Sequence, residues 1–287
     1  MSDAYDQKFP QPKLNQEHTK GRFKNHVAVI TGGASGIARE CVKRFASDGA
    51  SVAFIDINQD GGKALETDLR AAGYDVTFHY VDVSNRDTCF ETATKIADAY
   101  GGCINYVVNS AVYFGSKALD AEKDDWQKTM SVNVQGVANM VQACHPHMKK
   151  ASEGDRAIVN IGSISSHIAQ VTRWTYASSK GAILQMSRCM ALDLSNDGIR
   201  VNTVSPGWIW SPESAKGVNF DKAKWNPIWG KFDMLSRVGE MAEVAATVAF
   251  LCSRDASFVT GSDVAVDGGY MTMGPERHGL DGSTASW

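Results

Sequence analysis

Residues 26–48 constrain the fold of this chain more than any other segment. They open with a short β-branched run, HVAVIT, which is typical of a strand buried on both faces. The glycine-rich sequence TGGASGIA comes next, and an amphipathic stretch follows it. This order predicts a strand, a tight turn and a helix, in which Gly32 and Gly36 let the backbone approach a pyrophosphate at the positive end of the helix. Glycine-rich turns also merely connect elements, so the rest of the chain must decide between the two interpretations.

A second strand-like run ends in an acidic residue that is well placed for a nucleotide. The run SVAFID ends at Asp56, about 20 residues beyond Gly36, which is the spacing at which a carboxylate meets the adenosine ribose. A carboxylate accepts hydrogen bonds from ribose hydroxyls and repels a 2′-phosphate. We therefore predict NAD rather than NADP as the cofactor, although an acid at a strand end can also simply cap the next turn.

Strand-like and helical segments alternate along the remaining chain. Helices are predicted at 60–73, 86–100, 126–149, 174–193 and 241–251, and strands at 75–82, 104–110, 157–161, 200–204 and 263–266. Strict alternation implies right-handed crossovers and a parallel sheet with helices on both faces. We predict a single α/β domain at residues 23–272, a Rossmann-type doubly wound parallel sheet, between a polar N-terminal extension (1–22) and a polar C-terminal tail (273–287).

Composition argues against several other classes of protein. A net charge of -3 over 287 residues offers no basic surface, so we expect no nucleic-acid partner. No stretch approaches 18 apolar residues, and the N-terminus has no apolar signal region, so we expect neither a membrane partner nor secretion. The six cysteines are scattered without a CxxC pair, which predicts no metal site and no disulfide framework. Free thiols of this kind suit a cytoplasmic protein.

Tyr176 and Lys180 form the candidate catalytic pair. They lie four residues apart in a segment of helical composition, so their side chains share one helix face. A cation beside a phenol favours the phenolate and lowers the tyrosine pKa, which lets the tyrosine exchange a proton with an alcohol or a carbonyl. Such pairs also occur by chance on solvated faces. The pair gains weight because other marked residues, such as Ser163, should meet it where ligands bind, at the carboxyl ends of the strands.

Taken together, these motifs resemble those of the short-chain dehydrogenase/reductase family, in its shorter soluble branch. The matching features are the turn at Thr31, Asp82-Val83, an NNAG-like segment at Asn109, Asn133, Ser163, Tyr176-x-x-x-Lys180, Asn202, Pro206-Gly207 and the closing VTGSDVAVDGG. The likeness covers nearly the whole chain except its two ends. Two departures lie in the cofactor half: Ala38 replaces the last glycine of the turn, and NSAV replaces NNAG. Both substituents are small and remove no catalytic group, but they could slightly weaken cofactor binding.

The resemblance implies a role for each catalytic residue. Tyr176 is the general acid/base at the substrate oxygen, and Lys180 lowers its pKa and holds the nicotinamide ribose. Ser163 hydrogen-bonds the substrate oxygen, and Asn133 links Lys180 to solvent through a water. Residues expected to contact the cofactor are Gly32, Ser35, Gly36, Ile37, Asp56, Ile57, Asp82, Val83, Asn109, Ala111, Tyr176, Lys180, Pro206, Gly207, Ile209 and Ser211.

The segment 208–240 is expected to form a lid over the substrate pocket. It is rich in aromatic residues, namely Trp208, Trp210, Phe220, Trp225, Trp229 and Phe232. These rings either face a sugar or an apolar ring, or they pack the lid onto the body or onto a neighbouring subunit. Together with the polar residues Asp221, Lys222, Lys224 and Asn226, they favour a sugar, polyol or other polyhydroxylated substrate.

The predicted function is an NAD-dependent transfer of hydride between the cofactor and a small secondary alcohol or ketone. One alternative is a 3-oxoacyl or general carbonyl reductase that uses NAD(P)H. A second class is a catalytically silent dinucleotide-binding sensor, and the intact set of four catalytic residues argues against it. The resemblance also implies a homotetramer, or a homodimer, built through the helices predicted at 126–149 and 174–193.

Overall fold

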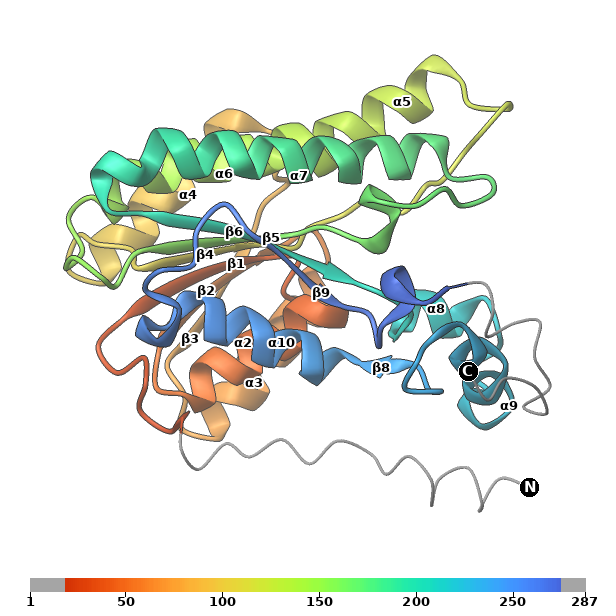
Figure 1. Ribbon diagram of the computed structural model, residues 1–287. Helices are drawn as coiled ribbons and strands as arrows, with labels where there is room; N and C mark the ends of the chain where they lie inside the picture. Colours follow the sequence, from red (N-terminus) through yellow and green to blue (C-terminus); the bar gives the residue numbers. More distant parts are fainter. Residues whose placement is uncertain (1–18, 275–287) are drawn as a thin grey trace.

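Figure 1 shows the computed structural model, which describes residues 19–274. A seven-stranded parallel sheet runs through its centre, with the strands in the order β3-β2-β1-β4-β5-β6-β9. The chain moves outward from β1 in one direction and then returns to the other side of β1 at β4. The sequence prediction of a Rossmann-type doubly wound sheet is therefore confirmed. The predicted N-terminal extension and C-terminal tail lie outside the described residues, except for 19–22 and 273–274.

The strands are short and mostly buried, as the continuous apolar runs predict. Their bounds are β1 Val27–Thr31, β2 Ser51–Asp56, β3 Val76–Tyr80, β4 Tyr106–Asn109, β5 Ala157–Ile161, β6 Arg200–Pro206 and β9 Asp263–Val266. Every residue of β1, β4, β5 and β6 is buried, because helices cover both faces of a parallel sheet. The polar residues that follow or end these strands all lie at one edge of the sheet.

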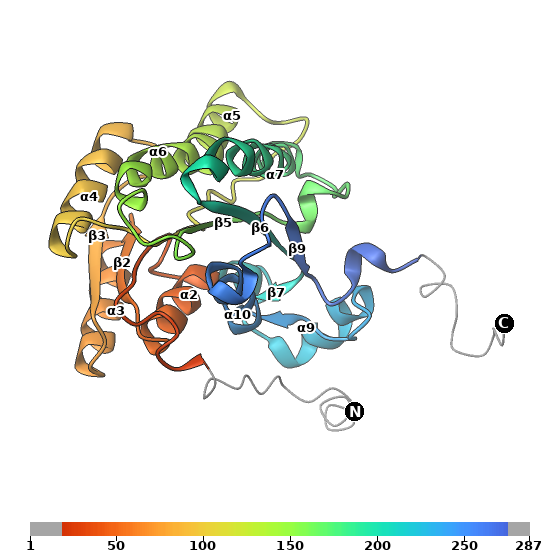
Figure 2. The same ribbon diagram turned by 60° about the vertical axis from the view of Figure 1, so that its left-hand side comes forward.

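Two helical layers cover the sheet, one on each face (Figures 1 and 2). One layer contains α2 Gly36–Ser47, α3 Gln59–Ala71 and α10 Met241–Cys252, and the other contains α4 Arg86–Ala99, α6 Gly136–Met148 and α7 Trp174–Leu194. Each layer closes its own apolar core, the first around Phe45 and Phe54 and the second around Ile96, Met140 and Ile158. These two cores fix the helices on the sheet and so position the side chains at its edge.

The long helix predicted at 126–149 is interrupted. It consists of α5 (Lys123–Met130), a π-helical turn at Ser131–Gln135 and α6. Apolar periodicity cannot reveal one inserted residue, because the helix keeps its direction through the turn. Such π turns occur frequently at functional sites, and Asn133 lies in the middle of this one.

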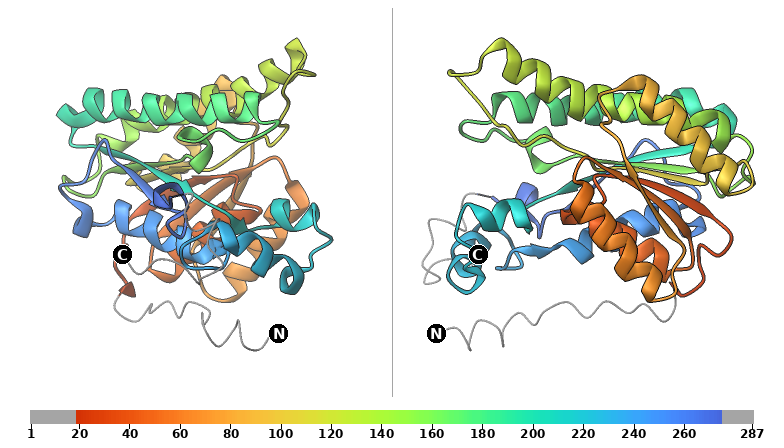
Figure 3. Two further views of the ribbon diagram at one scale, coloured as in Figure 1. Left: turned by 45° about the vertical axis from the view of Figure 1, so that its right-hand side comes forward. Right: turned by 180° about the vertical axis from the view of Figure 1, so that it is seen from behind.

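The lid is a small layer of its own at the end of the sheet (Figure 3). Strands β7 (Ile209–Trp210) and β8 (Gly239–Glu240) pair in parallel, and between them lie helices α8 (Pro212–Lys216) and α9 (Lys222–Trp229). Because β7 follows β6 after two residues, the lid is anchored at the carboxyl edge of the sheet.

Residues 19–23, the first that the structure describes, contact the C-terminal end of α2. The Thr19 hydroxyl donates to a carboxylate oxygen of Asp48 over 2.9 Å, and Arg22 forms an ion pair with the same carboxylate at 3.0 Å. Phe23 is fully buried and stacks on Phe45 with ring centroids 4.7 Å apart. These contacts hold residues 19–23 against the C-terminal end of α2, away from the carboxyl edge of the strands.

Candidate active site

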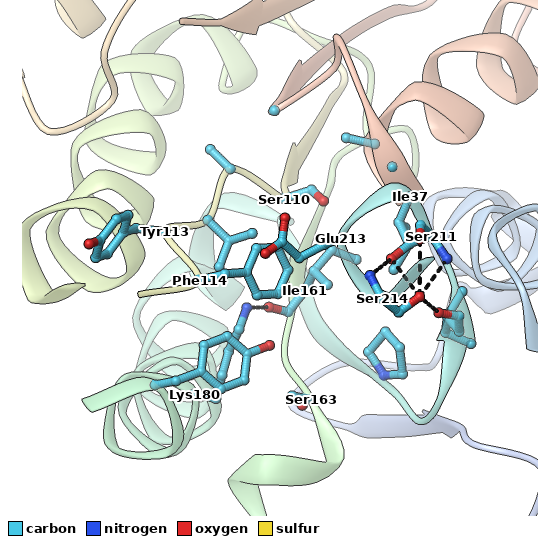
Figure 4. A pocket seen from close by; sticks show the side chains of 18 of the residues that line it. Ile37, Ser110, Tyr113, Phe114, Ile161, Ser163, Lys180, Ser211, Glu213 and Ser214 are labelled. Carbon is cyan, nitrogen blue, oxygen red and sulfur yellow. Dashed lines mark hydrogen bonds between the residues drawn. The ribbon is translucent and has the colours of Figure 1, made fainter. Parts of the chain in front are cut away.

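A cavity of about 940 Å³ opens at the carboxyl edge of the sheet, between the strand ends and the lid. Figure 4 shows part of its wall, with side chains contributed by both the body and the lid. Of the predicted cofactor contacts, the cavity wall contains Gly32, Ser35, Gly36, Ile37, Asp56, Ile57, Asp82, Val83, Ala111, Tyr176, Lys180, Pro206, Gly207, Ile209 and Ser211. The sequence motifs, although spread over 180 residues, therefore meet in one place.

The glycine-rich turn leaves room for an anion at the start of α2. Gly32 has φ +76°, and a Cβ atom there would meet the Ala111 backbone at 3.0 Å. Gly36 has φ +61°, and a Cβ atom there would meet nothing within 4 Å. Ser35, the N-cap residue of α2, makes no side-chain capping bond, so the first N–H groups of the helix remain available. This is the arrangement that holds a diphosphate.

Asp56 is held against this turn at the end of β2. One carboxylate oxygen accepts a hydrogen bond from the Ala34 N–H over 3.0 Å, and the other accepts from the Asn58 N–H over 2.8 Å. Each oxygen keeps a further lone pair for a ligand. Asp56 and the start of α2 thus share one wall of the cavity, and the predicted roles of Asp56 toward an adenosine ribose and of the turn toward a diphosphate stay predictions.

Asn109 is the one predicted cofactor contact that does not line the cavity. It is buried, and its side-chain amide donates to the Asn160 side-chain oxygen over 2.8 Å. The Asn160 amide in turn donates to the Ser187 hydroxyl on α7 over 2.9 Å. Asn109 thus ties β4 to β5 and α7 beneath the cavity floor, and its predicted contact with the cofactor finds no support in this geometry.

Tyr176 and Lys180 project from the first turns of α7, and both are buried. The Lys180 ammonium donates to the Ile161 carbonyl oxygen at the end of β5 over 2.7 Å. It also lies 5.7 Å from the centroid of the Tyr176 ring. Burial lowers the pKa of Lys180 to about 7, because an ammonium loses its hydration there. The lysine can therefore change its charge near neutral pH.

The pKa of Tyr176 departs from the sequence prediction. Burial raises this pKa above its ordinary value, whereas the Ser163 hydrogen bond and the positive charge of Arg173 lower it in part. Lys180 is not among the groups that lower this pKa; its ammonium is itself desolvated and donates to the Ile161 carbonyl oxygen. Arg173 is the cation that favours the tyrosinate.

Ser163 is positioned beside Tyr176 by a short chain of hydrogen bonds. Its hydroxyl donates to the Ser165 hydroxyl over 3.1 Å and accepts from the Ser165 backbone N–H over 3.1 Å. The Ser165 hydroxyl in turn donates to the Gln170 side-chain oxygen. The Gln170 oxygen is thereby engaged, and its amide N–H groups remain for the cavity that Gln170 lines.

Asn133 holds a loop and does not reach Lys180 through its side chain. Its side-chain oxygen accepts from the Tyr113 N–H over 2.7 Å. Its side-chain amide donates to the Tyr113 carbonyl over 3.1 Å and to the Ser179 hydroxyl over 3.0 Å. The predicted link through a water to Lys180 stays a prediction.

Two residues around Tyr176 were missed by the sequence reasoning. The Phe114 ring stacks on the Tyr176 ring, with centroids 5.6 Å apart and planes 20° apart. The Arg173 guanidinium lies 5.7 Å from the centroid of the same ring. Arg173 precedes Tyr176 by three residues, a spacing that could have revealed it, whereas nothing in the sequence around Phe114 indicates its contact.

Replacing Arg173 by glutamine is expected to shift the pH profile of alcohol oxidation. Oxidation requires the tyrosinate as base, and the positive charge of Arg173 lowers the pKa of Tyr176. Loss of this charge raises that pKa, so the acid limb of the kcat/KM profile moves to higher pH and the rate at pH 7 falls about three- to tenfold. The Arg173→Lys variant keeps the charge and serves as the matched control. Profiles that coincide for all three proteins would contradict the assignment.

The lid aromatics form mainly a cluster of their own. Trp229 lies at its centre, with ring centroids 5.2 Å from Trp208, 6.0 Å from Trp210 and 5.4 Å from Trp225. Of the six aromatic residues predicted in the lid, Trp208 and Trp229 line the cavity. Most of these rings therefore pack against one another within the lid, and two of the six, Trp208 and Trp229, also line the cavity.

The polar lid residues do not serve the cavity, contrary to the sequence prediction. Asp221 caps α9, Lys222 pairs with Glu240, and Asn226 accepts a hydrogen bond from the Val238 N–H. Lys224 lies over the Trp225 ring. These side chains make their contacts within the lid, so they give no evidence about the class of substrate.

The loop that follows β5 also carries His167, which pairs with Asp263 at 2.6 Å and does not line the cavity. Within residues 19–274, no group of three or more His, Cys, Asp or Glu side chains could hold a metal ion. In the same part of the chain, none of the helices has the length and apolar character needed to cross a membrane.

Comparison with known proteins gives the same family throughout. A family model described as enoyl-(acyl carrier protein) reductase matches residues 32–271. A glucose and ribitol dehydrogenase homolog of Oryza sativa subsp. japonica is 32% identical over 279 residues, which cover 92% of each chain. A 3-oxoacyl-[acyl-carrier-protein] reductase of Thermotoga maritima is 32% identical over 250 residues, covering 87% of this chain and 99% of the relative.

Solved structures agree with the sequence relatives. The ligand-free aldohexose dehydrogenase of Thermoplasma acidophilum superposes with a TM-score of 0.80 at 28% identity, covering 89% of this chain and 98% of that one. The match extends over nearly the whole described domain. The chain belongs to the short-chain dehydrogenase/reductase family, and it is an oxidoreductase that acts on CH–OH donors.

Proposed function

We propose that this protein is an NAD-dependent dehydrogenase that oxidises a secondary alcohol of a sugar, polyol or other polyhydroxylated small molecule. The observation that carries the proposal is the joint placement of Ser163, Tyr176 and Lys180 at one end of a cavity and of Asp56 at the other. A carboxylate at the adenosine end favours ribose hydroxyls over a 2′-phosphate by charge, which supports NAD.

The residues supply proton chemistry and positioning. When bound, the nicotinamide ring supplies the hydride acceptor. Ser163 donates a hydrogen bond to the alcohol oxygen, and the Tyr176 oxygen removes the hydroxyl proton. Lys180 changes charge near neutral pH and holds the ribose beside the tyrosine. In the reverse direction, Tyr176 returns the proton to the carbonyl oxygen while Ser163 stabilises the developing alkoxide.

Two relatives support a polyhydroxylated substrate, because their names are those of glucose, ribitol and aldohexose dehydrogenases. The cavity itself supplies an aromatic surface and polar groups near the reacting end, among them Phe114 and Gln170. Aromatic faces pack against the C–H face of a sugar, while polar groups meet its hydroxyls.

A 3-oxoacyl reductase is the second candidate. The 3-oxoacyl-[acyl-carrier-protein] reductase of Thermotoga maritima among the relatives favours it. Asp56 argues against it where the reductant is NADPH, because the carboxylate would face the 2′-phosphate at close range.

One assay tests both the proposed substrate class and the choice of NAD. Purified protein is incubated with NAD or NADP and a panel of sugars, polyols, hydroxy acids, steroid alcohols and aromatic diols, and absorbance is followed at 340 nm. We expect NAD reduction with sugars or polyols. Activity confined to steroid or aromatic alcohols contradicts the substrate class, and equal or better activity with the phosphorylated cofactor contradicts the choice of NAD.

We also propose that the protein assembles as a homotetramer or homodimer in the cytoplasm. Helices α5 and α7 carry exposed apolar side chains, including Trp126 and Met130 on α5 and Leu192 on α7. Exposed apolar residues on neighbouring helices suit a contact with a second copy. Sedimentation equilibrium of the purified protein tests the assembly, and a monomer at micromolar concentration would contradict it.

A further inference from the structure

Two oppositely charged side chains on the cavity wall form no hydrogen bond or ion pair through their charged groups within residues 19–274. Glu213, on lid helix α8, lines the cavity, and its carboxylate forms no hydrogen bond or ion pair with any of residues 19–274. Arg173 lines the cavity from the body, and its guanidinium meets only the Tyr176 ring within the same described part of the chain. Charged groups in a protein are usually paired or fully hydrated. Both groups are thus available to a ligand.

The Glu213 side chain takes no part in the capping hydrogen bonds of α8, and its charge lies in the first turn of the helix. Ser211 caps the helix by accepting from the Ser214 N–H over 3.3 Å, and the Ser214 hydroxyl accepts from the Ser211 N–H over 2.9 Å. Figure 4 shows the Glu213 carboxylate directed away from this capping pair, among the side chains that line the cavity. The capping box therefore fixes the helix and leaves the carboxylate free.

We propose that Glu213 and Arg173 bracket the substrate and recognise hydroxyl groups next to the reacting carbon. A carboxylate accepts from hydroxyl groups, and a guanidinium donates to them, so a polyol satisfies both at once through charge-assisted hydrogen bonds. The Gln170 amide adds a further donor close to Ser163. This inference rests on the proposed function and extends it by naming the residues that select the substrate.

The same pair explains which ligands the cavity disfavours. An apolar chain would cover the Glu213 carboxylate without offering it a donor, and burying an unpaired charge is costly. An anionic substrate would meet Arg173 favourably but would be repelled by Glu213. Neutral, hydroxyl-rich molecules are the class that suits both charges.

The test compares two substrates in three proteins. Wild type, Glu213→Gln and the control Lys216→Gln are assayed with the polyol or sugar found in the panel and with a secondary alcohol that has no other hydroxyl. Lys216 lies on the same helix, is exposed and does not line the cavity. The ratio of kcat/KM for the polyol to kcat/KM for the simple alcohol should fall about tenfold in Glu213→Gln, mainly through KM. In Lys216→Gln it should not change.

Each outcome bears on a separate claim. A wild type that oxidises no sugar or polyol overturns the proposed function, whatever the variants do. An active wild type with an unchanged ratio in Glu213→Gln overturns the role of Glu213 alone. An equal loss on both substrates also overturns it, because a general disturbance of the lid does not discriminate between ligands. Titration of NADH by fluorescence confirms that each variant is folded.

Discussion

Replacing Tyr176 by phenylalanine is expected to reduce kcat about a thousandfold while leaving NADH affinity nearly unchanged. The substitution removes the only oxygen of the side chain, and general acid–base catalysis by one residue contributes about 10²- to 10⁴-fold. The ring stays in place, because it is buried and stacked on Phe114. The measurement pairs steady-state rates at 340 nm with a fluorescence titration of NADH.

The Tyr176→Phe experiment also separates the enzyme from a silent dinucleotide-binding sensor. A sensor would show the same negligible turnover before and after the substitution, although it would bind NADH in both forms. The matched control is Tyr113→Phe, which removes the hydroxyl group from another tyrosine of the same cavity wall. Turnover that survives in Tyr176→Phe, or that is lost equally in Tyr113→Phe, contradicts the role of Tyr176.

The fold could be predicted from the sequence because each strand and each helix has its own local sequence pattern. Each buried strand is a short β-branched run, and each helix that follows has its own apolar face, so alternation alone leads to the doubly wound sheet. The π turn at 131–135 was not readable, because it changes the register of backbone hydrogen bonds and not the pattern of side chains. Element ends shifted by up to three residues: the helix expected from 126 begins at Lys123, and β3, expected at 75–82, spans Val76–Tyr80.

The site residues could be predicted where the backbone topology fixes their position. They could not be predicted where a side chain can point to either of two sets of partners. Ser163, Tyr176 and the glycine-rich turn sit at strand ends or first helix turns, so topology alone brings them together. Asn109 does not line the cavity, because a side chain at a strand end can point down into the core as well as up into the cavity, and its predicted cofactor contact stays a prediction. Glu213 was missed because only the folded lid shows that neighbouring serines cap α8 and release its carboxylate.

Replacing Asp56 by asparagine is expected to change the preference for NAD over NADP about 100- to 1,000-fold. Two effects act in the same direction. The neutral amide loses charge-assisted hydrogen bonds to the ribose hydroxyls, and it no longer repels a 2′-phosphate. The ratio of kcat/KM for NAD to kcat/KM for NADP, measured with one alcohol substrate, reports both.

Asparagine is the informative replacement because it keeps much of the local structure. Its side-chain oxygen can still accept the N–H of Ala34 or of Asn58, which the Asp56 carboxylate now holds on its two oxygens. The glycine-rich turn should therefore keep its shape, and kcat with saturating cofactor should stay close to that of wild type. Asp60→Asn is the matched control, since it removes a nearby carboxylate that lies exposed in the first turn of α3 and does not line the cavity. If Asp56→Asn leaves the ratio as it is in wild type, charge at this position does not select the cofactor, and the argument for NAD loses its physical basis.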